Sequence, residues 1–555
     1  MTSTLNRRLL LALAGAASTG PAFAQSQAQS FAAATAAAAT APDEPLQPGP
    51  FQPSWESLGS YQTPEWFRDA KFGIWAHWGP QCEPEVGDWY AREMYFEGQP
   101  KYRHHTATYG HPSQVGFKDV IRRWKAARWQ PDELLALYKQ AGARYFMALA
   151  NHHDNFDLYD SRHQPWNATR LGPQRDLIGG WAAAARAQGL PFGVSVHAAH
   201  AWTWYEAAQG ADRQGPLAGK PYDGSLRLQD GKGQWWEGLD PQDLYAQNHP
   251  RSANADKPNG IHSQWNWGNG ATVPSSAYCR KFLNRTVELL SRYRPELLYF
   301  DDTALPLWPV SDVGLKVAAH FYNLHATRQG ATQAVLFGKI LDEQQRRCMV
   351  WDIERGQSNA IEPLPWQTDT CLGDWHYDSR LLREHKYKSA NTVIHTLIDI
   401  VSKNGNLLLN VPVNRDGQID ADERRIVGEI GAWMRVNGES IYGTRPWTRF
   451  GEGPSLADSA PLQGPGFNEG KGKPLGAQDL RFTARGDTLY ASVFGLPADG
   501  QVRIESLAGK AHRPVQRIDL LGGAEKLRFR QDAEALTVTL PAGLAPSPAY
   551  VLRIV

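Results

Sequence analysis

The stretch "PDELLALYKQAGARYFMALA" at residues 131–150 contains the structural unit from which the fold can be inferred. Pro131 and the acidic residues after it are typical of a helix start, and Leu134 and Tyr138 belong to one apolar helical face. Gly142 ends the predicted helix, and the apolar run "YFMALA" that follows has the length of a buried strand. A helix followed by a buried strand is the repeating unit of a parallel sheet covered by helices.

The same helix–strand unit recurs on both sides of this stretch. A strand is predicted at "KFGIWAHWG" (71–79), and predicted helices precede the runs "PFGVSV" (191–196), "ELLYF" (296–300) and "NLLLNV" (406–411). Because the alternation extends over residues 53–447, we predict an α/β fold with a (β/α)8-like, TIM-type barrel.

Helical periodicity is absent after residue 447. Short alternating stretches are typical of strands, among them "DLRFTARGDTLYASVFGL" (479–496), which is expected to fold back at "RGD", and "AYVLRIV" (549–555). We therefore predict a C-terminal all-β sandwich over residues 448–555. It contains no cluster of catalytic side chains, which favours a stabilising role, and a sugar-binding role stays open.

The first 24 residues have the features of an export signal: a charged start, an apolar stretch and a small-x-small end. The mature chain is then expected to begin near Gln25, in the periplasm or outside the cell, and the pair Arg7-Arg8 is compatible with twin-arginine export. Residues 25–52 are mainly Ala, Gln, Ser and Pro, so we expect a disordered leader before the barrel.

Charge and composition exclude two classes of partner. The 58 Lys and Arg residues and the 57 Asp and Glu residues leave a formal charge of +1, which gives no field for attracting nucleic acid. No apolar run after the signal reaches the ~20 residues of a membrane span. The 21 Trp residues offer flat apolar faces that suit sugar rings. The 4 Cys residues are too few for a disulfide framework, so paired and free thiols both stay open.

Polar and titratable side chains follow the apolar runs at several places. In a (β/α)8 barrel the carboxyl ends of all strands meet at one mouth, where active sites lie. A long polar segment at 205–275, with Trp235, Trp236, Trp265 and Trp267, is expected to form a rim over this mouth. The side chains that we expect to converge there are His77, His152, His153, His197, His200, Asp301, Asp302, Asp352 and Glu354.

A metal site is one interpretation of this cluster. Its histidines lack the i, i+4 spacing of a helical zinc pair, and the adjacent His152 and His153 point to opposite sides of a regular strand. The calcium-like stretch "VNRDGQIDADE" (413–423) places Pro412 where the first acidic ligand should be. We therefore expect neither a metal nor another cofactor.

Carboxyl groups that face neutral hydrogen-bonding groups fit the cleavage of a glycosidic bond better. In that reaction one carboxylate attacks the anomeric carbon, and a second carboxyl group protonates the departing oxygen and later activates water. Asp301 is the stronger nucleophile candidate because it is the first charge after its strand, with Asp302 on the other side. Neutral histidines can donate to and accept from sugar hydroxyls without adding a fixed charge.

Five sequence motifs occur in an order that is specific to one enzyme family. They are "WFRDAKFGIWAHWGP" (66–80), "GDWYAREMY" (87–95), "NHHDNFDLYDS" (151–161), "PELLYFDD" (295–302) and "NGNLLLNVPVNRDGQI" (404–419). In this order they resemble the α-L-fucosidase family of retaining glycoside hydrolases. The resemblance covers residues 66–447, and the β-domain after it resembles the C-terminal sandwich of that family.

The resemblance implies an exo-acting, metal-independent enzyme that removes terminal α-L-fucosyl residues from glycans by double displacement. It places the nucleophile at Asp301. For the acid/base, whose position varies in the family, Glu354 is our choice, with Asp352, Glu343 and Glu362 as rivals. The implied sugar-binding residues are His77, Trp89, Tyr90, His152, His153, His197 and Tyr299. Two of them depart from the family pattern. Tyr299 stands where relatives often have Trp. His197, together with Ser195, stands where many relatives have a tyrosine.

Two other function classes stay open at this point. One is a non-catalytic sugar-binding protein on a barrel scaffold, and the other is a metal-dependent hydrolase that uses the His/Asp cluster. The linkage of the fucosyl group and the oligomeric state are not indicated by the sequence.

Overall fold

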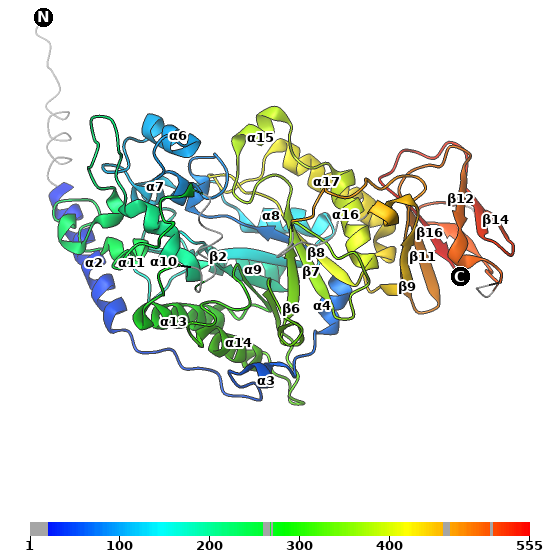
Figure 1. The fold of residues 1–555 in the computed structure, drawn as a ribbon, viewed down its shortest axis with the longest axis horizontal. Helices are drawn as coiled ribbons and strands as arrows, with labels where there is room; N and C mark the ends of the chain where they lie inside the picture. The colour runs from blue at the N-terminus through cyan, green and yellow to red at the C-terminus, as the bar shows by residue number, and fades with distance from the viewer. Residues whose placement is uncertain (1–19, 259–266, 268–269, 459–466, 511–513, 525) are drawn as a thin grey trace, which may run out of the picture.

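The computed structural model describes residues 20–258, 267, 270–458, 467–510, 514–524 and 526–555. At its centre is a closed barrel of parallel strands that pair in chain order from β1 to β8, with β8 returning to β1 (Figure 1). The predicted (β/α)8-like barrel is therefore confirmed. Its strands are β1 (Phe72–Ala76), β2 (Tyr145–Asn151), β3 (Phe192–Val196), β4 (Leu297–Phe300), β5 (Val335–Gly338), β6 (Val350–Glu354), β7 (Trp366–Cys371) and β8 (Gly405–Asn410).

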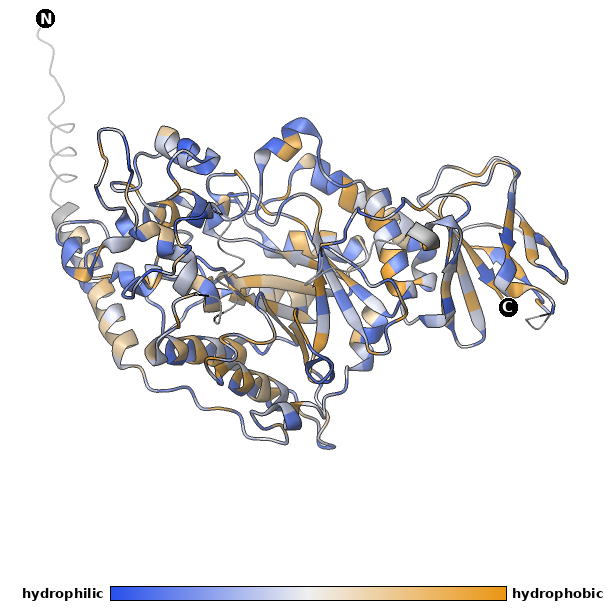
Figure 2. Cartoon of the chain, viewed as in Figure 1, coloured by the Kyte–Doolittle hydropathy of each residue, from blue (hydrophilic) through white to orange (hydrophobic). Residues whose placement is uncertain are grey.

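Helices cover the outside of the barrel, and the strands are buried on both faces. Figure 2 shows apolar residues concentrated along the barrel strands. The connections at 339–349 and 355–365 contain no α-helix, so the regular alternation is interrupted between β5 and β7. The helices between α3 and α17 are α3 (Trp55–Leu58), α4 (Glu65–Ala70), α5 (Tyr90–Glu93), α6 (Pro100–Thr108), α7 (Phe117–Arg123), α8 (Pro131–Gln140), α9 (Leu177–Ala187), α10 (Ala201–Trp204), α11 (Pro241–Tyr245), α13 (Ser276–Tyr293), α14 (Val313–Leu324), α15 (Ser379–Glu384), α16 (Ala390–Ser402) and α17 (Ala421–Asn437).

The stretch at 131–150 folds as its pattern predicts. Helix α8 has Pro131 in its first turn and buries Leu134, Leu135 and Tyr138. Gly142 follows it with a φ of 103°, a conformation that glycine adopts without strain. Strand β2 comes next, and all its residues are buried.

The C-terminal domain is an all-β sandwich, as predicted. A five-stranded sheet has the order β13-β16-β11-β10-β9, and a three-stranded sheet has the order β12-β15-β14. The predicted fold-back at "RGD" is the hairpin between β10 and β11, in which Arg485 pairs with Thr488. The boundary expected after Trp447 falls inside β9. The strands are β9 (Arg445–Glu452), β10 (Leu480–Arg485), β11 (Thr488–Val493), β12 (Gln501–Ile504), β13 (Ile518–Leu520), β14 (Arg528–Gln531), β15 (Leu536–Thr539) and β16 (Tyr550–Ile554).

The prediction of a disordered leader at residues 25–52 is wrong. This part of the chain forms helix α2 (Gly20–Thr40) and an extended segment that runs beside α13 and α14 (Figure 1). Phe31 and Phe51 are each only 4% exposed, and the side-chain amide of Asn323 bonds both backbone groups of Phe51 at 3.0 and 2.9 Å. A composition rich in Ala supports a helix, and two buried rings with such hydrogen bonds are enough to attach it to the barrel. The expected export signal falls mostly on residues 1–19, outside the described residues.

The described part of the segment at 205–275 contains several short helices, and its tryptophans do not form the expected rim. Trp236 and Trp267 are buried, and the ring of Trp267 stacks on His200 at 5.0 Å. Trp235 is half-buried and donates from Nε1 to Asp119 at 2.7 Å. Trp235 and Trp267 therefore pack against residues outside the segment, where they contribute packing area. Trp265 lies outside the described residues.

Two further observations concern thiols and membranes. All four cysteines lie in the described part of the chain, and each is a buried free thiol. Among the described residues, no helix has both the length and the apolar character needed to cross a membrane.

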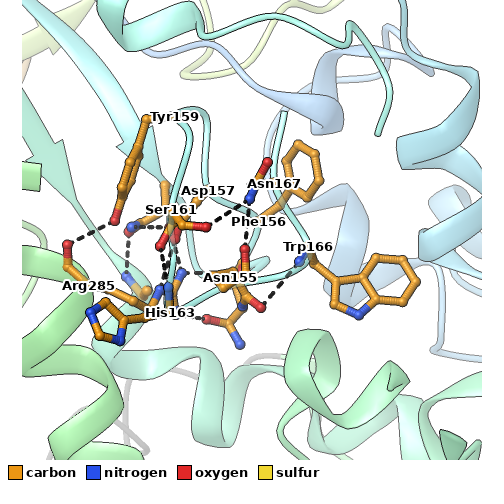
Figure 3. Close-up of polar contacts among 12 residues, drawn as sticks. Asn155, Phe156, Asp157, Tyr159, Ser161, His163, Trp166, Asn167 and Arg285 are labelled. Carbon is orange, nitrogen blue, oxygen red and sulfur yellow. Dashed lines mark hydrogen bonds and ion pairs between the residues drawn. The ribbon is translucent and has the colours of Figure 1, made fainter. Parts of the chain in front are cut away.

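The residues after the double histidine form a loop that is anchored to helix α13 (Figure 3). Arg285 of α13 binds Asp157 through two bonds, from Nε to Oδ2 at 3.0 Å and from a terminal nitrogen to Oδ1 at 2.6 Å. Both side chains are buried, and Asn151 at the end of β2 donates to the same Asp157 oxygen at 2.9 Å. Tyr159 donates to the backbone oxygen of Arg285 at 3.0 Å. Polar side chains of this loop therefore fix its position on the barrel.

Replacing Arg285 by Met should lower the free energy of unfolding by about 3–5 kcal/mol, because it leaves the buried Asp157 carboxylate without its cation. Urea unfolding followed by tryptophan fluorescence measures this loss. Arg292→Met is the matched control, since Arg292 lies on the same helix and pairs with Asp160 of the same loop, but at 42% side-chain exposure. Its loss should stay within about 1 kcal/mol. Equal losses in the two variants would contradict the anchoring role of Arg285.

Candidate active site

A cavity opens at the carboxyl ends of the barrel strands. Each strand from β1 to β7 contributes to it, either through its last residues or through the residues that follow. The described tryptophans of the 205–275 segment are not part of its wall. The lining side chains are Trp75, His77, Asp88, Trp89, His152, His197, Tyr299, Asp301, Lys339, Glu354, Asp369 and Trp375.

Asp301 stands directly after β4 and is held by three side chains. Its Oδ2 lies 3.0 Å from Nε2 of His153 and 3.3 Å from Nδ1 of His197, and its Oδ1 lies 2.5 Å from Nζ of Lys339. Burial alone would raise the pKa of Asp301, but the charge of Lys339 and the hydrogen bonds from His153 and His197 hold it well below its usual value. Asp301 is therefore ionised, as a nucleophile requires.

Glu354 ends strand β6 and has the opposite electrostatic character. Burial raises the pKa of Glu354 to about 7, with Lys339 opposing the shift and the negative charges of Asp369 and Asp301 adding to it. A carboxyl group with this pKa exchanges a proton readily near neutral pH, which suits it to act as acid and then as base.

Lys339 bridges the two carboxyl groups. Its Nζ lies 2.5 Å from Asp301 Oδ1 and 2.5 Å from Glu354 Oε2, so these two oxygens can be no more than twice that distance apart. Retaining glycosidases separate their carboxyl groups by roughly 5–5.5 Å, and inverting ones by roughly 6.5–9.5 Å to leave room for a water. The arrangement of Asp301 and Glu354 fits retention.

Two histidines present neutral rings to the cavity. Burial, together with the neighbouring histidines, lowers the pKa values of His77 and His152 well below the usual value. Gln81 contacts His152 Nδ1 at 2.7 Å through its amide nitrogen, and its amide oxygen accepts from the backbone N–H of Ala91 at 3.2 Å. This assignment makes His152 Nδ1 an acceptor and leaves the Nε2 hydrogen of its neutral ring to donate to a ligand hydroxyl.

A further pair of polar side chains adjoins these rings. His376 is buried, and its Nδ1 lies 2.5 Å from Asp88 Oδ1. The His376 ring lies 4.6 Å from that of His77 and 5.0 Å from that of His152, measured between ring centres. Asp88 itself lines the cavity, so this pair extends the hydroxyl-binding surface.

Most of the sugar-binding residues expected from the sequence line the cavity: His77, Trp89, His152, His197 and Tyr299. His153 is fully buried and contacts the carboxylate of Asp301 from behind the cavity wall.

Tyr90 and the rival acids lie elsewhere. The Tyr90 hydroxyl contacts His105 Nδ1 at 2.7 Å and does not line the cavity, because Tyr90 begins helix α5, which turns its ring away. Asp352 is buried inside the barrel, Glu343 lines a separate groove, and Glu362 contacts Arg346 at 3.4 Å. Among the four acid candidates, only Glu354 reaches the cavity.

Sequence reasoning missed Lys339 and Asp369. Lys339 is the first charged residue after the run "VLFG" at 335–338, so the rule that found Asp301 would also have found it. Asp369 lies within β7, whose sequence "WQTDTC" contains too many polar residues to be recognised as a buried strand. No local pattern would have identified it.

Three groups of side chains have ligand atoms within 4.8 Å of one another: His77, His152 and His197; Asp88, His152 and His376; and His153, His197 and Asp301. In the third group the ammonium of Lys339 already occupies the neighbourhood of Asp301, and its charge would repel a cation. In the first two, Nδ1 of His152 is already engaged by Gln81. The geometry favours hydroxyl binding over metal binding.

Comparisons with known proteins identify one family. A family model described as "Alpha-L-fucosidase" matches residues 38–439, and one described as "Alpha-L-fucosidase C-terminal domain" matches residues 474–555. Tissue alpha-L-fucosidase of Rattus norvegicus is 24% identical over 505 residues, covering 89% of this chain and 90% of its own length. Tissue alpha-L-fucosidase of Homo sapiens is 23% identical over 518 residues, covering 90% of each chain.

Solved structures share the fold. The alpha-fucosidase of Thermotoga maritima aligns with a TM-score of 0.64 and 24% identity, over 91% of this chain and 100% of its own. A Bacteroides thetaiotaomicron alpha-L-fucosidase, described as a trapped covalent intermediate, aligns with a TM-score of 0.58 and 16% identity, over 92% of this chain and 99% of its own. With one family model spanning the barrel and another the β-domain, this chain belongs to the α-L-fucosidase family, as its five motifs indicated.

Proposed function

We propose that the protein hydrolyses terminal α-L-fucosyl residues of glycans with retention of the anomeric configuration, through a covalent glycosyl-enzyme. The observation that carries this proposal is the bridging of Asp301 and Glu354 by one buried ammonium, Lys339. It keeps an ionised carboxylate and a protonated carboxyl group at the separation that double displacement needs.

In the first step, Asp301 attacks the anomeric carbon while Glu354 gives its proton to the glycosidic oxygen. The bond between that carbon and oxygen breaks, and the remaining glycan leaves as an alcohol. Lys339 and His153 keep the attacking carboxylate in one orientation, so little reorganisation is needed when the bond forms.

The second step follows from a change in charge. The covalent bond removes the negative charge of Asp301, which is one of the charges that raise the pKa of Glu354. The pKa of Glu354 therefore falls in the intermediate, and its carboxylate takes a proton from the incoming water. Water attacks the anomeric carbon, and Asp301 is released in its original ionised form.

The wall of the cavity suits a 6-deoxy sugar at the end of a chain. Trp75, Trp89 and Trp375 provide flat apolar surface for the ring and its methyl group. The neutral rings of His77 and His152 suit the hydroxyl groups. The substrate class is a fucosylated glycan.

We propose further that the enzyme works in the periplasm or outside the cell. The charged and apolar start of the chain supports export.

Replacing Asp301 by Asn should lower kcat/KM on 4-nitrophenyl α-L-fucoside by at least about 10³-fold, because the amide cannot attack the anomeric carbon. The matched control is Asp302→Asn, since the Asp302 carboxylate faces His200 at 3.1 Å outside the cavity. It should cost less than about tenfold. Proton NMR of the wild-type reaction should show α-L-fucose as the first product. A first product of β configuration, or a greater loss from Asp302→Asn, would refute the assignment of the nucleophile.

If Glu354 is the acid, kcat/KM should depend on pH and on the leaving group in a defined way. Wild-type kcat/KM should fall as pH rises through about 7, because Glu354 must carry its proton in the free enzyme. Glu354→Ala should lose about 10²–10⁴-fold on fucosylated glycans and much less on 4-nitrophenyl α-L-fucoside, whose leaving group scarcely needs protonation. The basic limb near pH 7 should vanish in the variant. Full activity of Glu354→Ala on glycans would place the acid elsewhere.

A further inference from the structure

Two carboxyl groups lie next to each other in the barrel interior beside the catalytic pair. Asp352 Oδ2 accepts from the side-chain amide of Gln367 at 2.8 Å, and Asp369 Oδ2 accepts from the Tyr299 hydroxyl at 2.8 Å. Oδ1 of each is buried and receives no N–H or hydroxyl group from the described residues. The two carboxyl groups are close enough to interact directly. Such a contact between two carboxyl groups is favourable only if one of them carries a proton.

The surroundings place the shared proton on Asp352. Burial raises the pKa of Asp369, but the ammonium of Lys339 and the hydroxyl that Asp369 accepts from Tyr299 both favour its ionised form. Asp352 is fully buried and is not part of the cavity wall. Burial, followed by the charge of Asp369, raises the pKa of Asp352 well above its usual value. The pair therefore carries one negative charge, and that charge is on Asp369.

The charge of Asp369 acts on Glu354. The two residues are paired across the neighbouring strands β6 and β7, and both line the cavity. A fixed negative charge at this position disfavours a second one on Glu354. On the opposite side of Asp369, β8 places Leu408, an apolar residue that cannot ionise. The titratable groups that face Asp369 and Glu354 from β4, β5 and β6 are Tyr299, Asp301, Lys339 and Asp352.

We propose that Asp369 is a positioning residue that keeps Glu354 in its acid form, and that the proton held by Asp352 fixes the negative charge on Asp369. This inference rests on the proposed function, because it assigns a role through the acid of that reaction. Asp369 also offsets part of the charge of Lys339. Removal of the Asp369 carboxylate therefore lowers the pKa of Glu354 in two ways: it removes a neighbouring negative charge, and it leaves the positive charge of Lys339 less compensated.

The test compares Asp369→Asn with Asp352→Asn. Asp369→Asn removes the negative charge, so the basic limb of kcat/KM should move to lower pH by about one unit or more. In Asp352→Asn, the new amide can accept from Gln367 and donate to Asp369, as the protonated acid does. Its basic limb should stay within about 0.3 pH unit of the wild-type limb, a small fraction of the shift from a neighbouring charge.

A second measurement does not depend on turnover. The infrared carboxyl signal of Glu354, isolated by difference from Glu354→Gln in each background, gives the midpoint of its titration directly. That midpoint should fall in Asp369→Asn and stay in place in Asp352→Asn. The neutral carboxylic-acid band of the resting enzyme at pH 7 should be reduced in Asp352→Asn.

The outcomes separate this inference from the proposed function. If the Glu354 midpoints shift as described but the protein cleaves no fucoside, the proposed function is overturned and the effect of Asp369 on Glu354 is not. A fucosidase whose Glu354 midpoint is unchanged in Asp369→Asn would overturn the positioning role, even if that variant turned over more slowly. Equal shifts in both variants would overturn the assignment of the proton to Asp352.

Discussion

The site depends on one buried cation placed between two carboxyl groups. Asp301 and Glu354 at this separation would compete for a single proton if no cation stood between them. Lys339 lets Asp301 stay ionised, while burial raises the pKa of Glu354 to about 7. Its position follows from the closed barrel, because β5 pairs with both β4 and β6, which carry the two acids.

How much the sequence predicts depends on whether the residues facing the barrel interior are apolar. Strands such as β2 contain continuous apolar runs, and the polar residues that follow these runs include His152 and Asp301, which both line the cavity. Strand β7 is buried too, but it directs Gln367 and Asp369 into the barrel, where they take part in a polar network. A search for apolar runs cannot find such a strand. The predicted barrel was therefore right while one wall of the site went unseen.

The double-histidine motif has two roles that its composition does not distinguish. His152 lines the cavity and His153 contacts Asp301, whereas Asp157 is neutralised by Arg285 on a helix more than a hundred residues away in sequence. The error about the leader has a similar origin. Composition measures how much apolar area a segment contains, and it cannot show that Phe51 meets the amide of Asn323. Both interactions depend on partners that only the folded chain brings together.

The docked helix α2 also decides which end of the protein is suited to attachment. Phe31 is buried, and Thr35 donates to the backbone oxygen of Gly238 at 2.8 Å, so helix α2 is tied to the segment that precedes α13. The C-terminus follows β16 in the β-sandwich, at the opposite end of the molecule (Figure 1). An affinity tag, a dye or a solid support fixed to that end leaves helix α2 and its contacts with the barrel undisturbed.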